Sequence, residues 1–115
     1  NGNIGDIWAL SQEEMYLIKN HKRDQVRSVW FMRHHPNKLE EKGFFPVAWV
    51  RGLGEGRVFY TTLGHREDLW STDPALKGRI NPVETSNQFR SHLLGGIRWA
   101  LGLAPGSAEP NPTTN

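Results

Sequence analysis

The chain has 115 residues, with 14 Lys and Arg against 12 Asp and Glu, which gives a net charge of +2. This length fits one domain or part of a larger one, and five Trp and five Phe supply material for a hydrophobic core. The absence of cysteine excludes a disulfide scaffold, a thiolate zinc site and a cysteine nucleophile. No apolar run approaches the roughly 18 residues of a membrane-spanning helix. We therefore expect a soluble protein with no membrane partner, and the cytoplasm is the favoured compartment.

Basic residues cluster once, at Lys19, His21, Lys22, Arg23 and Arg27, with Asp24 among them. A nucleic-acid surface of this kind would combine such a cluster with an aromatic-rich basic sheet, which does not follow here. The sequence therefore predicts a solvated loop and no nucleic-acid partner.

The first half of the chain contains one clear strand. Residues 11–14 (SQEE) match a capping box ahead of the apolar residues 15–18, so a short helix and an extended stretch are both open there. Residues 25–32 (QVRSVWFM) carry apolar side chains on both faces at their end, which indicates a strand covered on both sides. Residues 33–43 are polar and include a proline, which predicts a loop.

Two further strands are predicted at residues 45–51 and 57–63. The five residues between them include three glycines, a pattern typical of a β-hairpin. The same glycines could suggest a phosphate-binding loop, but that loop needs a helix directly after it, and here a strand follows.

The last predicted element is a helix over residues 86–101, after a long polar excursion at 71–86. Thr85 and Gln88 can form its capping box. One apolar stripe at helical spacing contains Phe89, Leu93, Ile97, Ala100 and Leu101. Gly95 and Gly96 weaken the helix, so we expect them to permit close approach to a sheet. Residues 104–115 contain three prolines and no aromatic residue, which predicts a disordered tail or linker.

The predicted elements do not make a complete sandwich. Three or four strands and one good helix cannot cover both faces of a sheet that is apolar on both sides. This pattern predicts a missing layer, supplied by preceding chain or by another subunit.

One short segment combines residues suited to catalysis. Residues 64–68 (GHRED) follow directly on a predicted strand, and ligands of open α/β sheets bind at the carboxyl ends of strands. His65 and Glu67 could meet there as a general base and the carboxylate that orients it, although no nucleophile accompanies them. Tyr60 and Trp70 could form an apolar wall for sugar rings. The alternative is a salt-bridged surface loop.

The other histidines are weaker candidates. His34 and His35 are adjacent, so on an extended chain they point in different directions, and the segment lacks further metal ligands. His92 lies beside the apolar stripe of the helix and is expected to pack there with one hydrogen bond. Glu14 and Tyr16 could reach the edge of a site, although capping alone would explain Glu14.

Three runs of sequence resemble one family. They are PVAW at 46–49, GRVFYTTLGHRED at 56–68, and the segment from Phe89 through HLLGGIRWALG at 92–102. Together they are similar to the C-terminal half of a ThuA-like domain, of the trehalose-utilisation family, over about residues 8 to 103. The resemblance implies an α/β class I glutamine amidotransferase-like, flavodoxin-like three-layer sandwich of about twice this length. It therefore implies that residues 1–103 are the C-terminal portion of a domain whose N-terminal half is absent, which is the missing layer.

The resemblance also implies a site. In glutamine amidotransferases of that fold, a late strand ends in a His-x-Glu pair serving a cysteine nucleophile, and His65 and Glu67 match that pair by position. This chain has no cysteine, so glutaminase chemistry is disfavoured. The family's association with disaccharide catabolism, in some members with 3-keto sugars, suits proton abstraction next to a carbonyl.

Two functional hypotheses follow from these residues. In the first, His65 and Glu67 are catalytic and Arg66, Trp70 and Tyr60 bind a sugar or similar small molecule. In the second, the domain is a non-catalytic carbohydrate-binding or assembly module. Neither hypothesis includes a metal or cofactor, and a homo-oligomer is compatible with both.

Overall fold

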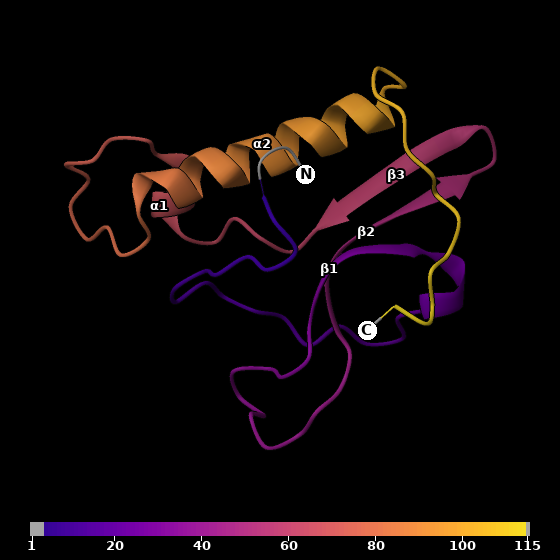
Figure 1. Cartoon of the computed structure of the whole chain (residues 1–115), viewed down its shortest axis with the longest axis horizontal. Helices are drawn as coiled ribbons and strands as arrows, with labels where there is room; N and C mark the ends of the chain where they lie inside the picture. Colours follow the sequence, from indigo (N-terminus) through magenta and orange to yellow (C-terminus); the bar gives the residue numbers. More distant parts are fainter. Residues whose placement is uncertain (1–3, 115) are drawn as a thin grey trace.

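The computed structural model describes residues 4–114 of the chain. It is an α/β structure with a three-stranded antiparallel sheet and a long C-terminal helix, shown in Figure 1. The elements are the 3₁₀ turn η1 (Arg23–Gln25), strands β1 (Arg27–Met32), β2 (Phe45–Leu53) and β3 (Gly56–Thr61), and helices α1 (Glu67–Trp70) and α2 (Val83–Ala100). The three strands and the C-terminal helix predicted from the sequence are thus confirmed, with shifted ends.

The sheet has the strand order β1-β2-β3. Two register irregularities in β1, around Trp30, account for apolar side chains on both faces of that strand. The hairpin between β2 and β3 is tighter than predicted, because Leu53 already pairs with Gly56. Its turn therefore has only two residues, and Gly54 adopts the positive φ of 58° that such a turn requires.

Helix α2 begins three residues earlier than predicted and without the predicted capping box. Pro82 is its N-cap, and no side chain caps the helix. Thr85 is instead buried within the first turn, and Gln88 accepts a hydrogen bond from the indole of Trp8 at 3.0 Å. Proline suits this position because the first helical amides need no intrahelical partner. The segment at residues 11–18, left open between helix and extended chain, contains no helix.

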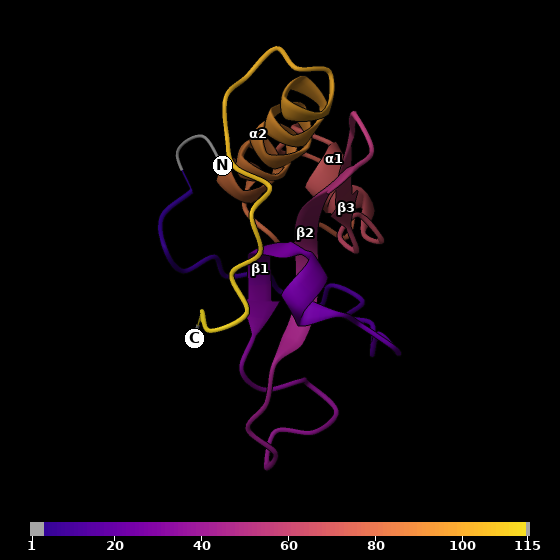
Figure 2. The ribbon, with the colours of Figure 1, turned by 90° about the vertical axis from the view of Figure 1, so that its right-hand side faces the viewer.

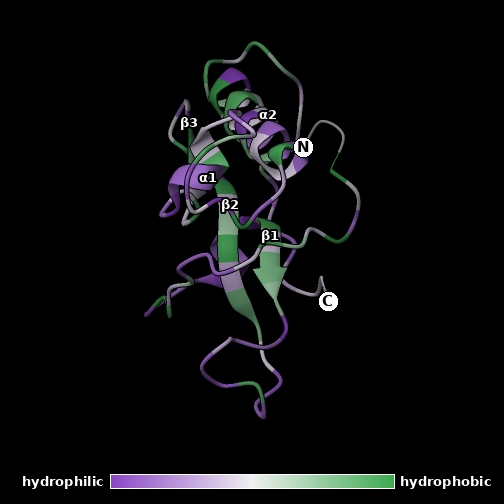
Figure 3. Ribbon diagram, turned by 90° about the vertical axis from the view of Figure 1, so that its left-hand side faces the viewer, coloured by the Kyte–Doolittle hydropathy of each residue, from purple (hydrophilic) through white to green (hydrophobic). Residues whose placement is uncertain are grey.

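The core lies where α2 and α1 meet the carboxyl end of β3. Its fully or nearly buried members are Val47, Leu63, Leu69 and Phe89. Trp8 and Leu10 pack against this cluster from the N-terminal segment, so a stretch without regular structure closes the core. Figure 3 shows hydrophobic colouring on β2 and β1, whereas the surrounding loops are mainly hydrophilic.

Gly96 is the contact point between α2 and the sheet. A Cβ atom at Gly96 would lie 2.2 Å from the Phe59 ring, whereas one at Gly95 would meet nothing within 4 Å. The predicted close approach is therefore confirmed for Gly96 and wrong for Gly95, which faces open space. Two adjacent helical residues point in directions about 100° apart, so only one of them can face the strand.

The segment from residue 104 onward, predicted as a disordered tail or linker, has defined contacts. The carbonyl of Gly106 accepts a hydrogen bond from the Trp99 indole at 3.0 Å. Farther along, the Asn111 amide accepts from the Ser28 backbone N–H at 2.6 Å and donates to the Ser28 carbonyl at 3.2 Å. Figure 2 shows the segment passing from the end of α2 toward β1. The prediction missed it because a side-chain amide can pair with a strand edge without any strand-like sequence pattern.

Large apolar surfaces of α2 face outward. Leu94, Ile97 and Leu101 are each more than half exposed, although the predicted apolar stripe placed Ile97 and Leu101 with the core. Phe89, at the start of that stripe, is fully buried as predicted. The missing layer stays a prediction. Within residues 4–114, no helix is both long enough and apolar enough to cross a membrane.

The glycine pair offers a matched test of this packing. We expect Gly96→Ala to lower the free energy of unfolding by about 1–3 kcal/mol, because the added methyl group must displace the Phe59 ring. Gly95→Ala should raise it by up to about 1 kcal/mol through helix propensity. Urea denaturation of both variants of the full-length protein measures the difference, and equal effects would contradict the contact.

Candidate functional site

The loop that follows β3 positions the predicted catalytic histidine. Gly64 has a φ of 119°, a region that favours glycine, and a Cβ there would come within 3.1 Å of Trp70 and 3.2 Å of Phe89. The Trp70 indole donates a hydrogen bond to the Gly64 carbonyl at 2.8 Å. Glycine is thus required at position 64 because of its backbone conformation and because a side chain there would crowd Trp70 and Phe89. The next residue, His65, lies at the edge of the core.

His65 pairs with Glu14 and not with Glu67. Its Nδ1 lies 2.7 Å from the Glu14 carboxylate, and both side chains are about half exposed. Among the residues that the structure describes, no hydrogen bond or ion pair joins His65 to Glu67. The predicted His65–Glu67 pairing was therefore wrong. The chain enters α1 at Glu67, and side chains two positions apart at a helix start do not face each other.

Glu13 and Asn81 hold the segment that carries Glu14. The Glu13 carboxylate accepts the Gly64 backbone N–H at 3.2 Å. The Asn81 side chain bonds both backbone groups of Ser11, accepting from its N–H at 2.7 Å and donating to its carbonyl at 2.9 Å. The pair with His65 thus depends on contacts across 51 to 70 residues of sequence.

A buried carboxylate, Asp68, organises the loop beneath His65. Arg66 donates to it through two nitrogens, at 2.9 and 3.1 Å. The backbone N–H groups of Ile80 and Asn81 donate at 2.8 and 2.9 Å. The Arg66 hydrogen bond and these backbone donors outweigh burial and hold the pKa of Asp68 well below its usual range.

Arg79 connects the long loop that follows α1 to the backbone of Asp68. Its guanidinium donates to the carbonyls of Asp68 and Asn81 and to the Ser86 hydroxyl, at 3.0 to 3.2 Å. The Ser86 hydroxyl in turn donates to the Asp68 carbonyl at 2.7 Å. Sequence reasoning missed Asp68, Arg79 and Asn81 as organisers of the site, because the runs that contain them resemble solvated surface loops.

A hollow of about 310 Å³ lies beside His65. Gln12, Glu67 and Lys77 share its wall with His65 and the Arg66–Asp68 pair. The predicted residues His65, Arg66 and Glu67 therefore do come together, although in different relations from those expected. Imidazole, carboxylate and ammonium groups around one hollow can bind hydroxyl and carbonyl groups and exchange protons with them.

Aromatic side chains extend from this site across the sheet. Tyr60 stacks on Trp49 with ring centroids 4.3 Å apart and stays 45% exposed. Tyr16 is equally exposed, and the nearby Glu14 carboxylate is the main reason that its pKa is raised. Trp70 is half exposed and packs edge-on against Phe89. The assigned roles of Tyr60 and Trp70 in binding, like that of Arg66, stay predictions.

His34, His35 and His92 have hydrogen-bond partners within the protein. His35 is buried, with Nε2 2.9 Å from the Met15 carbonyl and Nδ1 accepting the Asn37 N–H, and His34 contacts the Leu39 carbonyl. His92 is fully buried, 3.0 Å from the Thr61 hydroxyl, and burial lowers its pKa to about 4. In residues 4–114, no three histidine, aspartate or glutamate side chains gather as a metal site.

The chain belongs to the ThuA family, which is described as trehalose utilisation. The family model matches residues 2–100 of its 115 residues. No curated protein and no solved structure matches the chain significantly. The match agrees with the resemblance of the GRVFYTTLGHRED and HLLGGIRWALG runs, and trehalose utilisation is the association of the family as a whole.

The Asp68 network predicts a strong and pH-dependent effect on stability. Asp68→Asn removes a buried carboxylate that accepts hydrogen bonds from Arg66 and from two backbone N–H groups, so we expect a loss of about 2–3 kcal/mol in the free energy of unfolding near neutral pH. Asp6→Asn, at an exposed position, should change it by less than about 0.5 kcal/mol. Chemical denaturation of the full-length protein measures both.

The pH dependence has a definite sign. The folded-state pKa of Asp68 is depressed, so its contribution is complete above the unfolded value of roughly 4 and is lost as the pH falls below that value. In the Asp68→Asn variant, the free energy of unfolding should therefore fall less steeply as the pH drops below about 4. An equally steep fall in the variant and the unaltered protein would contradict the role given to Asp68.

Proposed function

We propose that this chain provides a carbohydrate site in which His65, oriented by Glu14, transfers a proton to and from an oxidised sugar. The observation that carries the proposal is the 2.7 Å contact between the Glu14 carboxylate and Nδ1 of His65, a residue that lines the hollow. A carboxylate on Nδ1 fixes the tautomer in which Nε2 accepts a proton. Histidine is the side chain best suited to such transfer near neutral pH.

The proposed step starts at a carbon next to a sugar carbonyl. The C–H bond breaks, its proton goes to Nε2 of His65, and its electron pair forms an enediolate whose negative charge rests on the former carbonyl oxygen. Reprotonation at the former carbonyl carbon, with transfer of the hydroxyl proton from the neighbouring carbon to the former carbonyl oxygen, completes an isomerisation. In an elimination, the enediolate re-forms the carbonyl, the C–O bond on the next carbon breaks, and the leaving oxygen takes the proton from His65. Neither outcome requires an oxidant or a reductant.

Some of the other site residues predicted from the sequence have different roles in this proposal. Glu67 and Lys77 line the hollow and are placed to contact sugar hydroxyls. Arg66 acts through Asp68, because its guanidinium already forms two hydrogen bonds there. Tyr60 and Trp70 present exposed ring surface, which suits the apolar faces of sugar rings.

A non-catalytic carbohydrate-binding or assembly module is the second candidate. The half exposure of both His65 and Glu14 favours it, because water weakens the electrostatic interaction that would activate a base. Binding of a disaccharide without turnover would support this module.

The same proposal includes the flavodoxin-like, glutamine amidotransferase-like three-layer sandwich, with an N-terminal half of the domain packed on this chain. Three exposed leucine and isoleucine side chains on α2 support it, and so does β1, whose only partner strand in the described part of the chain is β2. Uncovered apolar helix faces and open strand edges are unusual in a finished domain.

This architecture predicts that residues 1–103 alone are marginally stable. Without a further layer we expect aggregation or a broad thermal transition, and addition of an N-terminal half should give a sharp one. Differential scanning calorimetry with light scattering makes the measurement. A sharp, monomeric, two-state melt of residues 1–103 by themselves would count against the sandwich.

His65→Ala should reduce turnover of a 3-keto disaccharide by about 10²–10⁴-fold, the usual contribution of a general base. Glu14→Gln should reduce it more than Glu67→Gln does, because Glu14 is the residue that orients the ring. Glu55→Gln, in the remote hairpin turn, is the matched control. The readout is exchange of the sugar's α-hydrogen with deuterium from solvent, followed by NMR in the full-length protein.

Two outcomes would reject the catalytic part. Unchanged exchange in a folded His65→Ala protein would remove His65 from the mechanism. A larger effect of Glu67→Gln than of Glu14→Gln would return the orienting role to the residue first predicted from sequence.

A further inference from the structure

The basic cluster at residues 19–27 has no part in the His65 site. The structure brings two of its lysines, Lys19 and Lys22, to one hollow of about 230 Å³. Arg51 reaches the same hollow from β2, and Trp49 forms part of its wall. The cluster that the sequence indicated as a solvated loop therefore surrounds a concavity, together with a cation from a distant strand.

The three cations are not neutralised by the protein. Within residues 4–114, none of Lys19, Lys22 and Arg51 forms a salt bridge, and no carboxylate is among the wall residues described. Asp24, the acidic residue of the cluster, forms none either and does not line the hollow. Cations gathered without carboxylates in a concave site produce a positive potential that attracts anions.

His21 supplies a second and independent observation. It lines the hollow, and its Nε2 is buried without a hydrogen-bond partner. The ring is fixed between two aromatic side chains, edge-on to Trp49 at 4.7 Å and stacked with Phe44 at 6.2 Å. Buried polar atoms are normally satisfied, so an orphaned ring nitrogen calls for a missing partner. In the tautomer with the proton on Nε2, that partner is a hydrogen-bond acceptor. The nitrogen is closed off from solvent in this structure, so the ring must turn for an anion's oxygen in the hollow to reach it.

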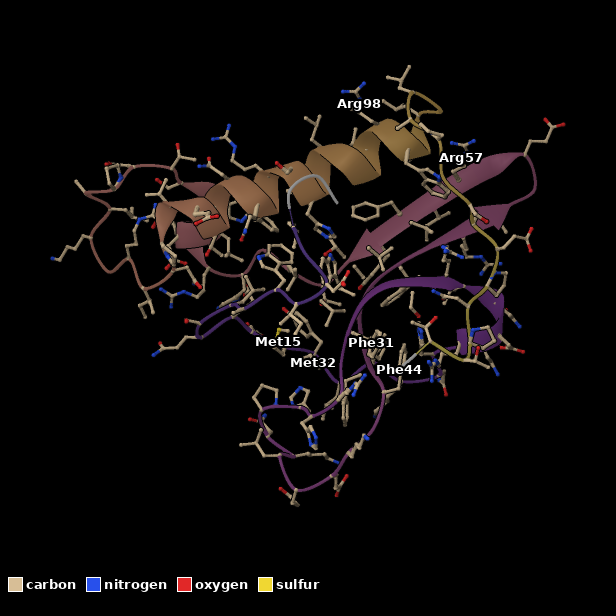
Figure 4. All side chains as sticks on the ribbon, in the orientation of Figure 1. Met15, Phe31, Met32, Phe44, Arg57 and Arg98 are labelled. Carbon is tan, nitrogen blue, oxygen red and sulfur yellow. The ribbon has the colours of Figure 1, made fainter. Side chains whose placement is uncertain are left out.

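Further positive charge lies beside Phe44. A neighbouring hollow of about 390 Å³ is lined by Arg23, Arg33 and Lys42, with Phe31 and Phe44 in its wall. Phe31 and Phe44 stack at 4.8 Å, and Figure 4 shows them together near the base of β1. This second group of cations strengthens the potential at the first hollow, because His21 in the wall of the first hollow stacks on Phe44 in the wall of the second.

We propose that the hollow bounded by Lys19, Lys22, Arg51, His21 and Trp49 binds the phosphate group of a phosphorylated small molecule. Lysine and arginine provide the charge-assisted hydrogen bonds that phosphate oxygens prefer, and the volume suits a group of this size. The organic part lies along the outside of the Trp49–Tyr60 stack toward Tyr60, which is 45% exposed, because the facing sides of the two rings cover each other.

The phosphate site is independent of the reaction assigned to His65. Only the identity of the organic part as a sugar rests on the proposed function. The stacked rings lead from the basic hollow toward the His65 site, since Tyr16 neighbours both Tyr60 and Glu14. A sugar phosphate could therefore place its phosphate at the hollow and its ring on the aromatic surface.

The test uses inorganic phosphate, glucose 6-phosphate and glucose as probes of the full-length protein, with binding followed by ³¹P NMR line broadening and calorimetry. Lys22→Gln combined with Arg51→Gln should weaken the affinity for phosphate by on the order of tenfold or more. The matched control is Arg90→Gln combined with Arg98→Gln, which removes the same charge from exposed positions on α2. It should leave the affinity within about twofold.

Each result decides one part of the proposal. Equal losses in the two double variants would show attraction by net charge alone and would overturn the site, as would absence of phosphate binding to the unaltered protein. Glucose 6-phosphate binding no tighter than inorganic phosphate would overturn the role of Trp49. His65→Ala should retain phosphate binding, so a failure of the proposed reaction stays distinguishable from a failure of this site.

Discussion

The burial of one carboxylate, Asp68, is the constraint on which the rest of the site depends. A buried charge is tolerated only when it is fully paired, and here one guanidinium and two backbone amides meet that demand. To supply these donors, the excursion after α1 must fold back over the loop that ends β3. Asn81, one of the donors, also forms two side-chain hydrogen bonds with the backbone of Ser11. Satisfying Asp68 therefore brings the N-terminal segment, with Glu14, to His65.

The buried polar groups that hold the loop are distinct from the exposed pair, His65 and Glu14, to which we assign the chemistry. The polar groups that hold the loop are buried or partly buried, so their hydrogen bonds are strong in a low-dielectric setting. His65 and Glu14 lie above them and are about half exposed, which leaves the imidazole open to a ligand. The proton transfer that we propose requires such a fixed platform, because a base that is misplaced by a small distance loses most of its effect.

The sheet also links two surfaces of different charge. The hollow at His65 mixes acidic and basic side chains, whereas the hollow at Lys22 and Arg51 has only basic ones. Trp49, in the wall of the basic hollow, stacks on Tyr60 of the neighbouring strand. Cross-strand aromatic pairs of this kind are rigid, so they can carry an apolar ring without a large loss of conformational entropy.

The sequence by itself determined the strands, the hairpin, the C-terminal helix and the position of the GHRED run directly after the last strand, because periodicity, glycine placement and motif are local properties. Tertiary structure alone decided that His65 pairs with Glu14 instead of Glu67, that Asp68 is buried, and that residues 109–111 lie against β1. These outcomes depend on which distant groups satisfy one another's hydrogen bonds and charges. No local pattern encodes that choice, since a Glu two positions away and a Glu 51 positions away are equally good partners for an imidazole until the fold selects one.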